Sequence, residues 1–143
     1  MTSISRPGPV VIGLGCSSSA QAGEIVALMH ACLSEAGIDS GAIVAIATHV
    51  RKRDSLALMQ SASHFDLALR FLDDDDLALG VPGTSEAVAA AAGPLLLGKR
   101  KSRFATCAIA VAAPGFVPSA FGQPASPSAA MASSTLATSL AGP

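Results

Sequence analysis

The chain has 143 residues, half of them hydrophobic, with a net charge of −1, 3% aromatic residues and no Trp or Tyr. That length suits one domain, and the near-zero charge provides no global field to attract nucleic acid or an anionic membrane. The shortage of aromatic rings counts against base stacking, and no apolar run approaches the roughly 20 residues of a membrane span, so neither nucleic acid nor a membrane is expected as a partner.

The first expected element is a short apolar run at residues 10–14 that ends at Gly15. This pattern predicts a buried strand of an α/β sheet. Residues 16–19 supply small polar groups for a turn, and apolar residues then recur at helical spacing up to Gly37, a residue suited to the left-handed C′ position. A strand that leads directly into a helix points free N–H groups at the carboxyl edge of the sheet, where open α/β sheets bind ligands.

Four more strands and two more helices are expected downstream. The strands are expected at residues 42–47, 67–72, 95–97 and 104–111, and the helices at residues 51–64 and 84–92, with a loop at residues 80–83. The short link between the last two strands favours an antiparallel hairpin. This order predicts a single three-layer α/β/α domain over residues 9–113, with a mixed sheet of about five strands.

The composition changes at Pro114. From there to residue 143 Ala, Ser, Pro and Gly dominate without charged residues, which predicts a disordered tail whose removal would leave thermal stability nearly unchanged. The three cysteines are odd in number and form no CxxC pair, so a reduced, cytoplasmic protein is expected. Residues 12–16 superficially resemble a lipoprotein cleavage site, but the preceding apolar segment is too short for the roughly 7–15 residues of a signal peptide core.

The turn at residues 13–19 is the first candidate binding element. It lacks the third glycine of a G-x-G-x-x-G motif and the Gly-Lys of a P-loop, and no acidic residue follows the second strand. What remains is a set of N–H groups and hydroxyls able to receive an anionic group. Cys16, beside a helix N-terminus, could act as a nucleophile, but no His or acid partner can be identified in the sequence, so an inert thiol is favoured.

Seven of the nine Lys and Arg residues lie in two runs, at residues 51–53 and 99–103. Such runs are usually solvated loops, but the first follows the carboxyl end of a strand, where a ligand cleft is expected. Two basic loops around a cleft would suit a ligand with several carboxylates or phosphates. Glu86 is either an ordinary charge at a helix start, or an acid/base group or hydrogen-bond acceptor at the same cleft.

The three histidines are scattered along the chain. His49 follows a strand end and is the only one credible for the site, whereas His30 and His64 are interpreted as structural. No set of residues has metal-ligand spacing, so neither a metal nor a cofactor is expected.

Four stretches carry a family resemblance when they are taken in order. They are Gly13–Cys16 (GLGC), residues 47–52 with Thr48 and Lys52, residues 83–90 (GTSEAVAA), and residues 99–110 with KRKS and ATCAIA. Together they resemble the CobE family, which is similar to the C-terminal domain of CbiG of cobalamin (vitamin B12) biosynthesis. That family usually has one or two arginines after the cysteine of the first stretch. Here Ser17 and Ser18 stand there, so an anion contact at that turn loses its charged partner.

The resemblance implies a part in building the corrin ring. CbiG-type proteins open a lactone on a ring-contracted cobalt intermediate and release acetaldehyde, and a CobE-like chain without the N-terminal part of CbiG is not expected simply to share that activity. The implied partners are a corrin or precorrin intermediate with multiple carboxylates, and other enzymes of the pathway. A carrier or accessory role is favoured. The alternatives are an enzyme that acts on a precorrin by lactone hydrolysis or rearrangement, and a generic phosphate- or nucleotide-binding protein.

The ligand is expected at the carboxyl edge of the sheet. Lys99 and Lys101 reach this edge only if the last hairpin turns there, and Arg100 is expected to point into solvent. No catalytic residue can be assigned. The expected ligand-binding residues are Gly13, Gly15, Cys16, Ser17, Ser18, Thr48, His49, Lys52, Thr84, Ser85, Glu86, Lys99 and Lys101.

Overall fold

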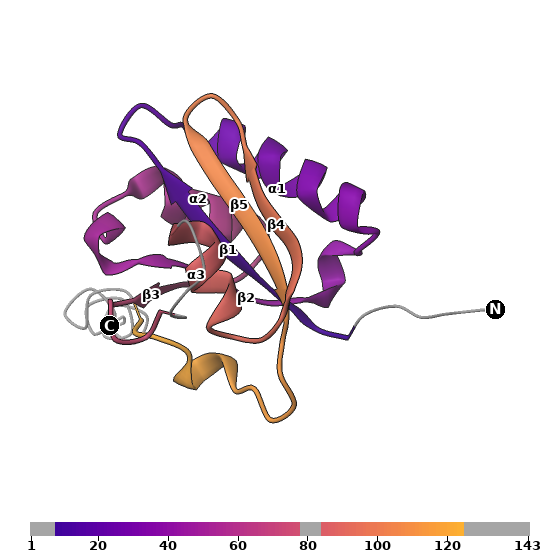
Figure 1. Ribbon diagram of the computed structural model, residues 1–143. Helices are drawn as coiled ribbons and strands as arrows, with labels where there is room; N and C mark the ends of the chain where they lie inside the picture. The colour runs from indigo at the N-terminus through magenta and orange to yellow at the C-terminus, as the bar shows by residue number, and fades with distance from the viewer. Residues whose placement is uncertain (1–7, 78–83, 125–143) are drawn as a thin grey trace, which may run out of the picture.

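Five strands form one mixed sheet, in the order β3-β2-β1-β5-β4 (Figure 1). The computed structural model describes residues 8–77 and 84–124. The strands are β1 (Val10–Cys16), β2 (Ile43–His49), β3 (Leu69–Leu72), β4 (Leu95–Lys101) and β5 (Ala105–Val111). β1 pairs in parallel with β2 and β2 with β3, whereas β5 runs antiparallel to both β1 and β4. The carboxyl ends of β1, β2, β3 and β4 therefore meet at one edge, which also holds the β4–β5 hairpin tip.

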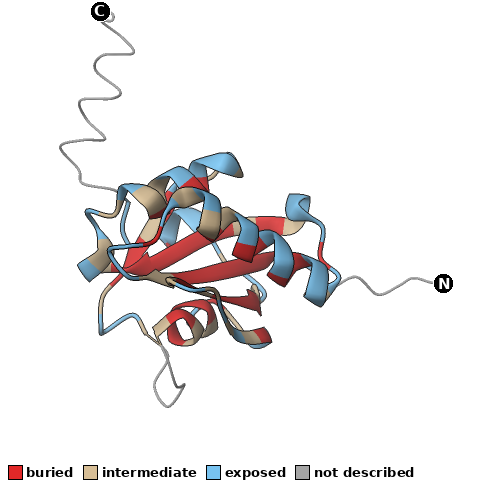
Figure 2. Ribbon diagram, turned by 90° about the horizontal axis from the view of Figure 1, so that it is seen from above, coloured by how far each residue is buried: buried red, intermediate tan, exposed pale blue. Residues whose placement is uncertain are grey.

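Helices cover both faces of this sheet, and the buried strands lie between them (Figure 2). The helices are α1 (Ala22–Ala36), α2 (Leu56–His64) and α3 (Thr84–Ala90), with short 3₁₀ turns η1 (Ser40–Ala42), η2 (Val50–Lys52) and η3 (Pro118–Ala120). The apolar residues of α1 and α2 pack on one face and those of α3 on the other. The predicted α/β/α layering and the five-stranded mixed sheet are confirmed. In residues 8–77 and 84–124, no helix is both long and apolar enough to cross a bilayer.

Strand β1 shows how the two layers are separated. Ile12 and Leu14 are fully buried on the α1 and α2 face, and Val11 is fully buried on the α3 face, as the period of two in a strand requires. Gly13 lies beneath α3, where an added Cβ would come within 2.8 Å of the backbone nitrogen of Ala89. The predicted binding residue Gly13 is therefore a packing residue that lets α3 lie directly against the sheet.

Residues 99–101 of the second basic run lie on a strand, not in a loop as the sequence predicted, and Arg103 lies in the hairpin turn. β4 continues past residue 97 to Lys101, so Lys99 and Lys101 belong to an edge strand that runs to the hairpin tip. The first basic run forms η2 and a following turn, and α2 begins only after Ser55, whose Oγ accepts a hydrogen bond from the N–H of Leu58 at 3.2 Å.

Residues 114–124 pack against the sheet, so the disorder that the sequence predicted from Pro114 onward is wrong for this segment. Phe121 is buried, and Gln123 forms a two-way backbone bridge with Phe71 of β3 at 2.9 and 2.8 Å. Arg70, the one charged residue of β3, donates hydrogen bonds to the carbonyl oxygens of Phe121, Ser119 and Gly122 at 2.8, 2.9 and 3.2 Å. The loop predicted at residues 80–83 and the tail beyond residue 124 lie outside the described residues.

Candidate functional site

The carboxyl edge of the sheet carries a cleft made of two adjoining hollows, which we call the inner and the outer hollow. Their volumes are about 350 and 410 Å³, within the range of about 300–1,000 Å³ that is common for small-molecule sites. The inner hollow is lined by Gly15, Cys16, Thr48, His49, Arg51, Lys52, Thr84, Ser85, Lys99 and Thr106. The outer hollow is lined by Cys16, Ser17, Ser18, Ala20, Arg51, Lys52, Asp54, Ser55, Leu56 and Ala57.

The structure brings most of the predicted binding residues together. Eight of the thirteen line the inner hollow, namely Gly15, Cys16, Thr48, His49, Lys52, Thr84, Ser85 and Lys99. Two more, Ser17 and Ser18, line the outer hollow. Lys101 lines a third hollow of about 230 Å³ beside the hairpin tip, which shares Cys16 and Ser17 with the outer one. Gly13 and Glu86 line none of the three.

Glu86 does not line the cleft but contacts β4, whose residue Lys99 does. Its Oε2 accepts a hydrogen bond from the backbone N–H of Lys99 at 2.7 Å. An added Cβ on Gly98 would come within 2.9 Å of the same carboxylate oxygen. The carboxylate of α3 thus holds the edge strand β4 in place, while Glu86 also lies in the first turn of its helix, as an ordinary charge at a helix start would.

The three side chains of the first basic run have different surroundings. Arg51 donates a hydrogen bond to Thr84 Oγ1 at 3.1 Å and so joins η2 to the start of α3. Arg53 points away from the cleft: it donates to Gln123 Oε1 at 3.3 Å and its guanidinium carbon lies 5.9 Å from the centre of the Phe71 ring. Lys52 is half-buried and lines both hollows, and its side chain makes no hydrogen bond or ion pair with any residue that the structure describes.

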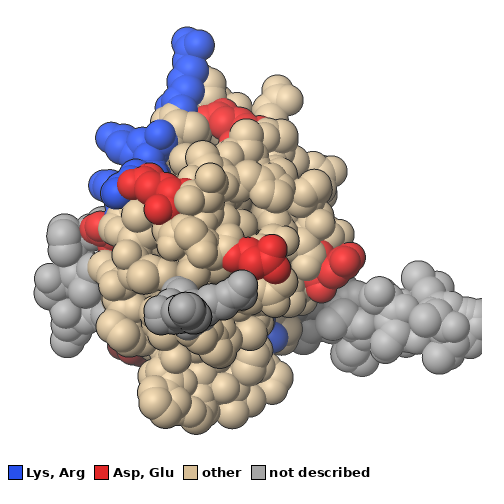
Figure 3. All heavy atoms as spheres, turned by 90° about the vertical axis from the view of Figure 1, so that its right-hand side faces the viewer, with Lys and Arg blue, Asp and Glu red and all other residues tan. Residues whose placement is uncertain are grey.

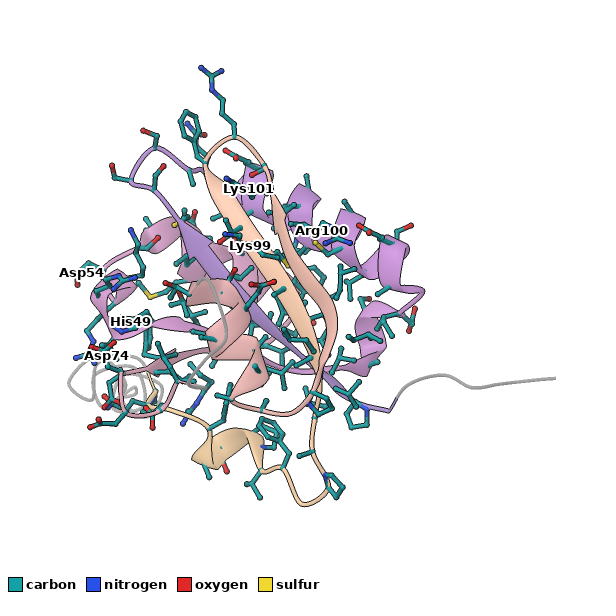
Figure 4. The ribbon with its side chains drawn as sticks, in the orientation of Figure 1. His49, Asp54, Asp74, Lys99, Arg100 and Lys101 are labelled. Carbon is teal, nitrogen blue, oxygen red and sulfur yellow. The ribbon has the colours of Figure 1, made fainter. Side chains whose placement is uncertain are left out.

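The β4 residues divide between the two faces of the sheet (Figure 4). Lys99 lines the inner hollow and Lys101 the third one, whereas Arg100 forms a bidentate ion pair with Glu35 of α1, with its shortest contact at 2.6 Å. The Arg100 side chain is 43% exposed, so it reaches solvent as expected while it also pairs with Glu35. This hydrogen-bonded pairing lowers the pKa of Glu35. On the face drawn in Figure 3, most of the Lys and Arg side chains gather toward one end of the molecule.

His49 is held by both of its ring nitrogens. Nδ1 accepts a hydrogen bond from the backbone N–H of Arg51 at 3.1 Å, so in the neutral ring Nε2 carries the proton and donates it to Asp74 Oδ1 at 2.7 Å. The side chain is buried, while that of Asp74 is 90% exposed. His49 therefore lines the inner hollow as a positioning residue that fixes the turn carrying Arg51.

Three hydroxyl and thiol groups face the same space. Thr48 Oγ1 donates to the carbonyl oxygen of Leu14 at 2.8 Å and ties β2 to β1. Cys16 Sγ lies 3.8 Å from Ser55 Oγ. Ser85 is 1% exposed, and its Oγ has no hydrogen-bond partner among the described residues. A buried hydroxyl without a partner loses its hydration without compensation, so a hydrogen-bond acceptor within reach of Ser85 would stabilise it.

The hairpin tip beside the cleft is anchored by Glu24 in the first turn of α1. The Glu24 carboxylate accepts hydrogen bonds from the hydroxyl of Ser102 and from the backbone N–H of Phe104, the latter at 2.6 Å. These two hydrogen bonds, with that from Ser102 first, lower the pKa of Glu24. The tip is thus fixed to α1, while Lys101 stays exposed beside the third hollow.

Sequence reasoning missed two residues that line the inner hollow. Arg51 stands next to Lys52 in the first basic run and could have been included on that ground. Thr106 pairs with Gly15 across β1 and β5, where an added Cβ on Gly15 would come within 2.7 Å of Thr106 Oγ1. That proximity depends on the strand register, which no local sequence signal gives.

The lining favours binding of an anion. Arg51, Lys52 and Lys99 contribute three cations, and Asp54 is the single acidic residue among the described residues that line the two hollows. Arg and Lys groups form charge-assisted hydrogen bonds with carboxylates and phosphates. In the described parts of the chain, no group of three or more His, Cys, Asp or Glu residues is arranged to hold a metal ion.

Comparisons with known proteins agree with this fold. The family model "Cobalamin synthesis G C-terminus" matches residues 10–79. A curated relative, Protein CobE from Sinorhizobium sp, is 31% identical over 64 residues, which make up 45% of this chain and 42% of that protein. The solved structure of CobE, described as a protein from the cobalamin (vitamin B12) biosynthetic pathway, is 24% identical with a TM-score of 0.63, over 75% of this chain and 92% of that one. At that identity the likeness shows the fold.

A second solved structure is closer in sequence. The cobalamin biosynthesis protein chiG from Agrobacterium tumefaciens str. C58 is 26% identical with a TM-score of 0.62, over 73% of this chain and 98% of that one. The match to the curated relative spans less than half of that relative's length. The resemblance seen in the four sequence stretches is nevertheless confirmed by the family model, the relative and the structures. This chain is therefore similar to the CobE family of cobalamin biosynthesis proteins and to the C-terminal region of cobalamin synthesis protein G.

Proposed function

We propose that this protein binds a corrin-ring intermediate of cobalamin biosynthesis in the cleft at the carboxyl edge of the sheet, as a carrier or accessory protein. The observation that carries the proposal is the convergence of Arg51, Lys52 and Lys99 on one cleft, together with the Ser85 hydroxyl, which has no hydrogen-bond partner within residues 8–77 and 84–124. These groups suit a ligand that presents several carboxylates, because each cation can make a charge-assisted hydrogen bond.

The chemistry of the pathway supplies such a ligand. Its tetrapyrrole intermediates carry many acetate and propionate carboxylates around a large apolar ring. The cleft is open and offers both kinds of surface: Leu56 and Ala57 line the outer hollow beside Lys52, and Leu56 is 63% exposed. A ring lying over the apolar part could therefore direct its side-chain carboxylates toward the cations.

A binding role is favoured over catalysis by the state of the two most reactive side chains. Both nitrogens of His49 are engaged with protein groups. Within the described residues, the thiol of Cys16 has one partner at hydrogen-bonding distance, the hydroxyl of Ser55. Nucleophilic catalysis needs a base within hydrogen-bond reach of the nucleophile. The Ser55 hydroxyl is not such a base, and the His49 nitrogens are bonded to other groups.

The test is a titration with hydrogenobyrinic acid, a corrinoid that keeps free carboxylates, followed by its visible absorption. A saturable spectral shift with a defined stoichiometry supports the proposal that the protein binds a corrin-ring intermediate. A protein that leaves the spectrum unchanged, and gives no heat in a calorimetric titration of the same mixture, contradicts it. Incubation with late precorrins then separates the two roles: a shift that stops at stoichiometric amounts indicates a carrier, and continued conversion indicates an enzyme.

A further inference from the structure

Two histidines from different helices meet on the surface of the α1 and α2 layer. The Nε2 atoms of His30 in α1 and His64, the last residue of α2, lie 3.5 Å apart. Both side chains are exposed. We propose that this histidine pair chelates one divalent late first-row transition-metal ion, such as Zn²⁺ or Ni²⁺, with water in the remaining coordination positions.

The spacing of the two nitrogens fits a shared metal ion. Imidazole nitrogens bind zinc at about 2.0–2.1 Å in tetrahedral geometry, which puts two of them roughly 3.3–3.4 Å apart. The 3.5 Å between the His30 and His64 nitrogens differs little from this value. Their ring planes are nearly perpendicular, at 87°, so both edges can point at one ion without a clash between the rings.

Phe65 holds the two rings in this arrangement. Its ring centre lies 5.1 Å from that of His30 and 5.0 Å from that of His64. Phe65 is itself half-buried and packs against the main core, so it restricts the freedom of both imidazoles. A site whose ligands are already placed loses less conformational entropy on binding than one formed by two free side chains.

The ligand set determines the class of ion. Neutral imidazole suits Zn, Cu and Ni, whereas Mg and Ca prefer oxygen ligands. Within the described parts of the chain no third His, Cys, Asp or Glu completes a cluster with this pair. The ion would therefore be held by two protein ligands and would exchange readily with solution. Sequence spacing could not show this site, because the two histidines are 34 residues apart and meet only when α1 packs on α2.

This site is separate from the cleft. α2 begins at Leu56, which lines the outer hollow, and ends at His64. The eight steps from Leu56 to His64, at a rise of 1.5 Å each, place the pair roughly 12 Å farther along the layer. Metal binding and corrinoid binding can therefore succeed or fail independently.

The test is a calorimetric titration of the full chain with Zn²⁺, in a Cys16→Ser background that removes the half-exposed thiol. We expect one ion per chain, and an affinity that weakens as the pH is lowered because protons compete for the imidazole nitrogens. Titration with Co²⁺ supplies a spectroscopic readout, since its visible d–d bands change when imidazole nitrogens replace water ligands.

Single variants assign the ion to the pair. His30→Ala and His64→Ala should each weaken Zn²⁺ binding at least about tenfold, because each leaves one protein ligand, and should reduce the change in the Co²⁺ bands. The matched control Ser34→Ala, at an exposed position one turn from His30, should keep both. Since all three positions are exposed, circular dichroism without metal should be unchanged. If the parent shows no saturable binding at millimolar Zn²⁺, or if either histidine variant binds as the parent does, the pair is only a hydrogen-bonded contact and the proposal is wrong.

Discussion

The buried ring of His49 bridges Asp74 and the backbone of Arg51, with Nε2 2.7 Å from Asp74 Oδ1 and Nδ1 3.1 Å from the N–H. One side chain therefore determines both the end of β2 and the path of the turn that carries the cleft cations. Both ring nitrogens are engaged with protein groups, and the ring holds the turn that carries Arg51 and Lys52.

Replacing His49 with Ala should loosen this turn. The N–H of Arg51 loses its acceptor, which costs on the order of 1 kcal/mol of unfolding free energy, and corrinoid affinity should fall because the cations lose their fixed position. Asp74→Asn is the matched control, since an amide oxygen can still accept the proton of Nε2 and the position is solvent-exposed. Urea unfolding and corrinoid titration of the two variants test this. Equal losses in both would mean that the charge of Asp74, and not the placement of the turn, is what matters.

Ser85→Ala should separate stability from binding. The free protein should be as stable as the parent or slightly more stable, because a buried hydroxyl without a partner is removed. Corrinoid affinity should fall by roughly fivefold if the hydroxyl donates to a ligand carboxylate, which corresponds to about 1 kcal/mol. Thermal melts without ligand and titrations with ligand measure the two effects. A variant that is less stable and binds normally would assign Ser85 to packing alone.

Glu24 should make the stability of the hairpin tip depend on acid pH. Its pKa is lowered from the ordinary 4.5 by hydrogen bonds from Ser102 and Phe104. The unfolded chain therefore takes up the proton at higher pH than the folded chain, so this stabilisation is complete above pH 4.5 and is lost as the pH falls through the folded value. The melting temperature of the parent should fall more steeply below pH 4.5 than that of Glu24→Gln. Parallel curves of melting temperature against pH for the two proteins would show that the Glu24 carboxylate does not contribute to the loss of stability in acid.

The segment around Phe121 should contribute to the stability of the fold. Phe121 is buried against β3, and truncating a buried Phe costs about 3–5 kcal/mol. Phe121→Ala should therefore lower the denaturant midpoint strongly. Val117→Ala, at a position that is 52% exposed, is the control and should change it little. If both variants have the same denaturant midpoint as the parent, residues 114–124 do not belong to the cooperative unit, as the sequence had indicated.

Local patterns predicted the sheet, its helices and most of the cleft. The apolar run of β1, the helix end at Gly37 and the polar residues after β2 are all local signals, and parallel strands bring their carboxyl ends together in any such fold. The packing of Gly13 against α3 could not be predicted locally, because α3 lies more than 70 residues away in sequence. A glycine that permits close packing has the same local sequence as one that faces a ligand.

The two remaining errors concern the length of β4 and the packing of residues 114–124, and each has its own physical cause. β4 was predicted too short because its charged residues 99–101 lie on an edge strand, where charge is tolerated and even protective. Had the strand been extended, its period of two would have put Lys99 and Lys101 on one face and Arg100 on the other. The packing of residues 114–124 depends on hydrogen bonds that Arg70 donates to their carbonyl oxygens, and composition alone does not predict these contacts.

The most direct test of the binding site compares Lys52→Ala with Arg100→Ala in a titration with hydrogenobyrinic acid. Lys52 lines both hollows, whereas Arg100 is paired with Glu35 on the α1 side of the sheet. Lys52→Ala loses one charge-assisted contact, worth about 1.5–3 kcal/mol before solvent screening. Its affinity for the corrinoid should therefore be about tenfold or more weaker than that of the parent at low salt. The difference from the parent should shrink at high salt because exposed charges are screened. Arg100→Ala should bind nearly as the parent does. If Lys52→Ala binds as tightly as the parent at low salt, or if Arg100→Ala loses as much, the ligand does not occupy this cleft.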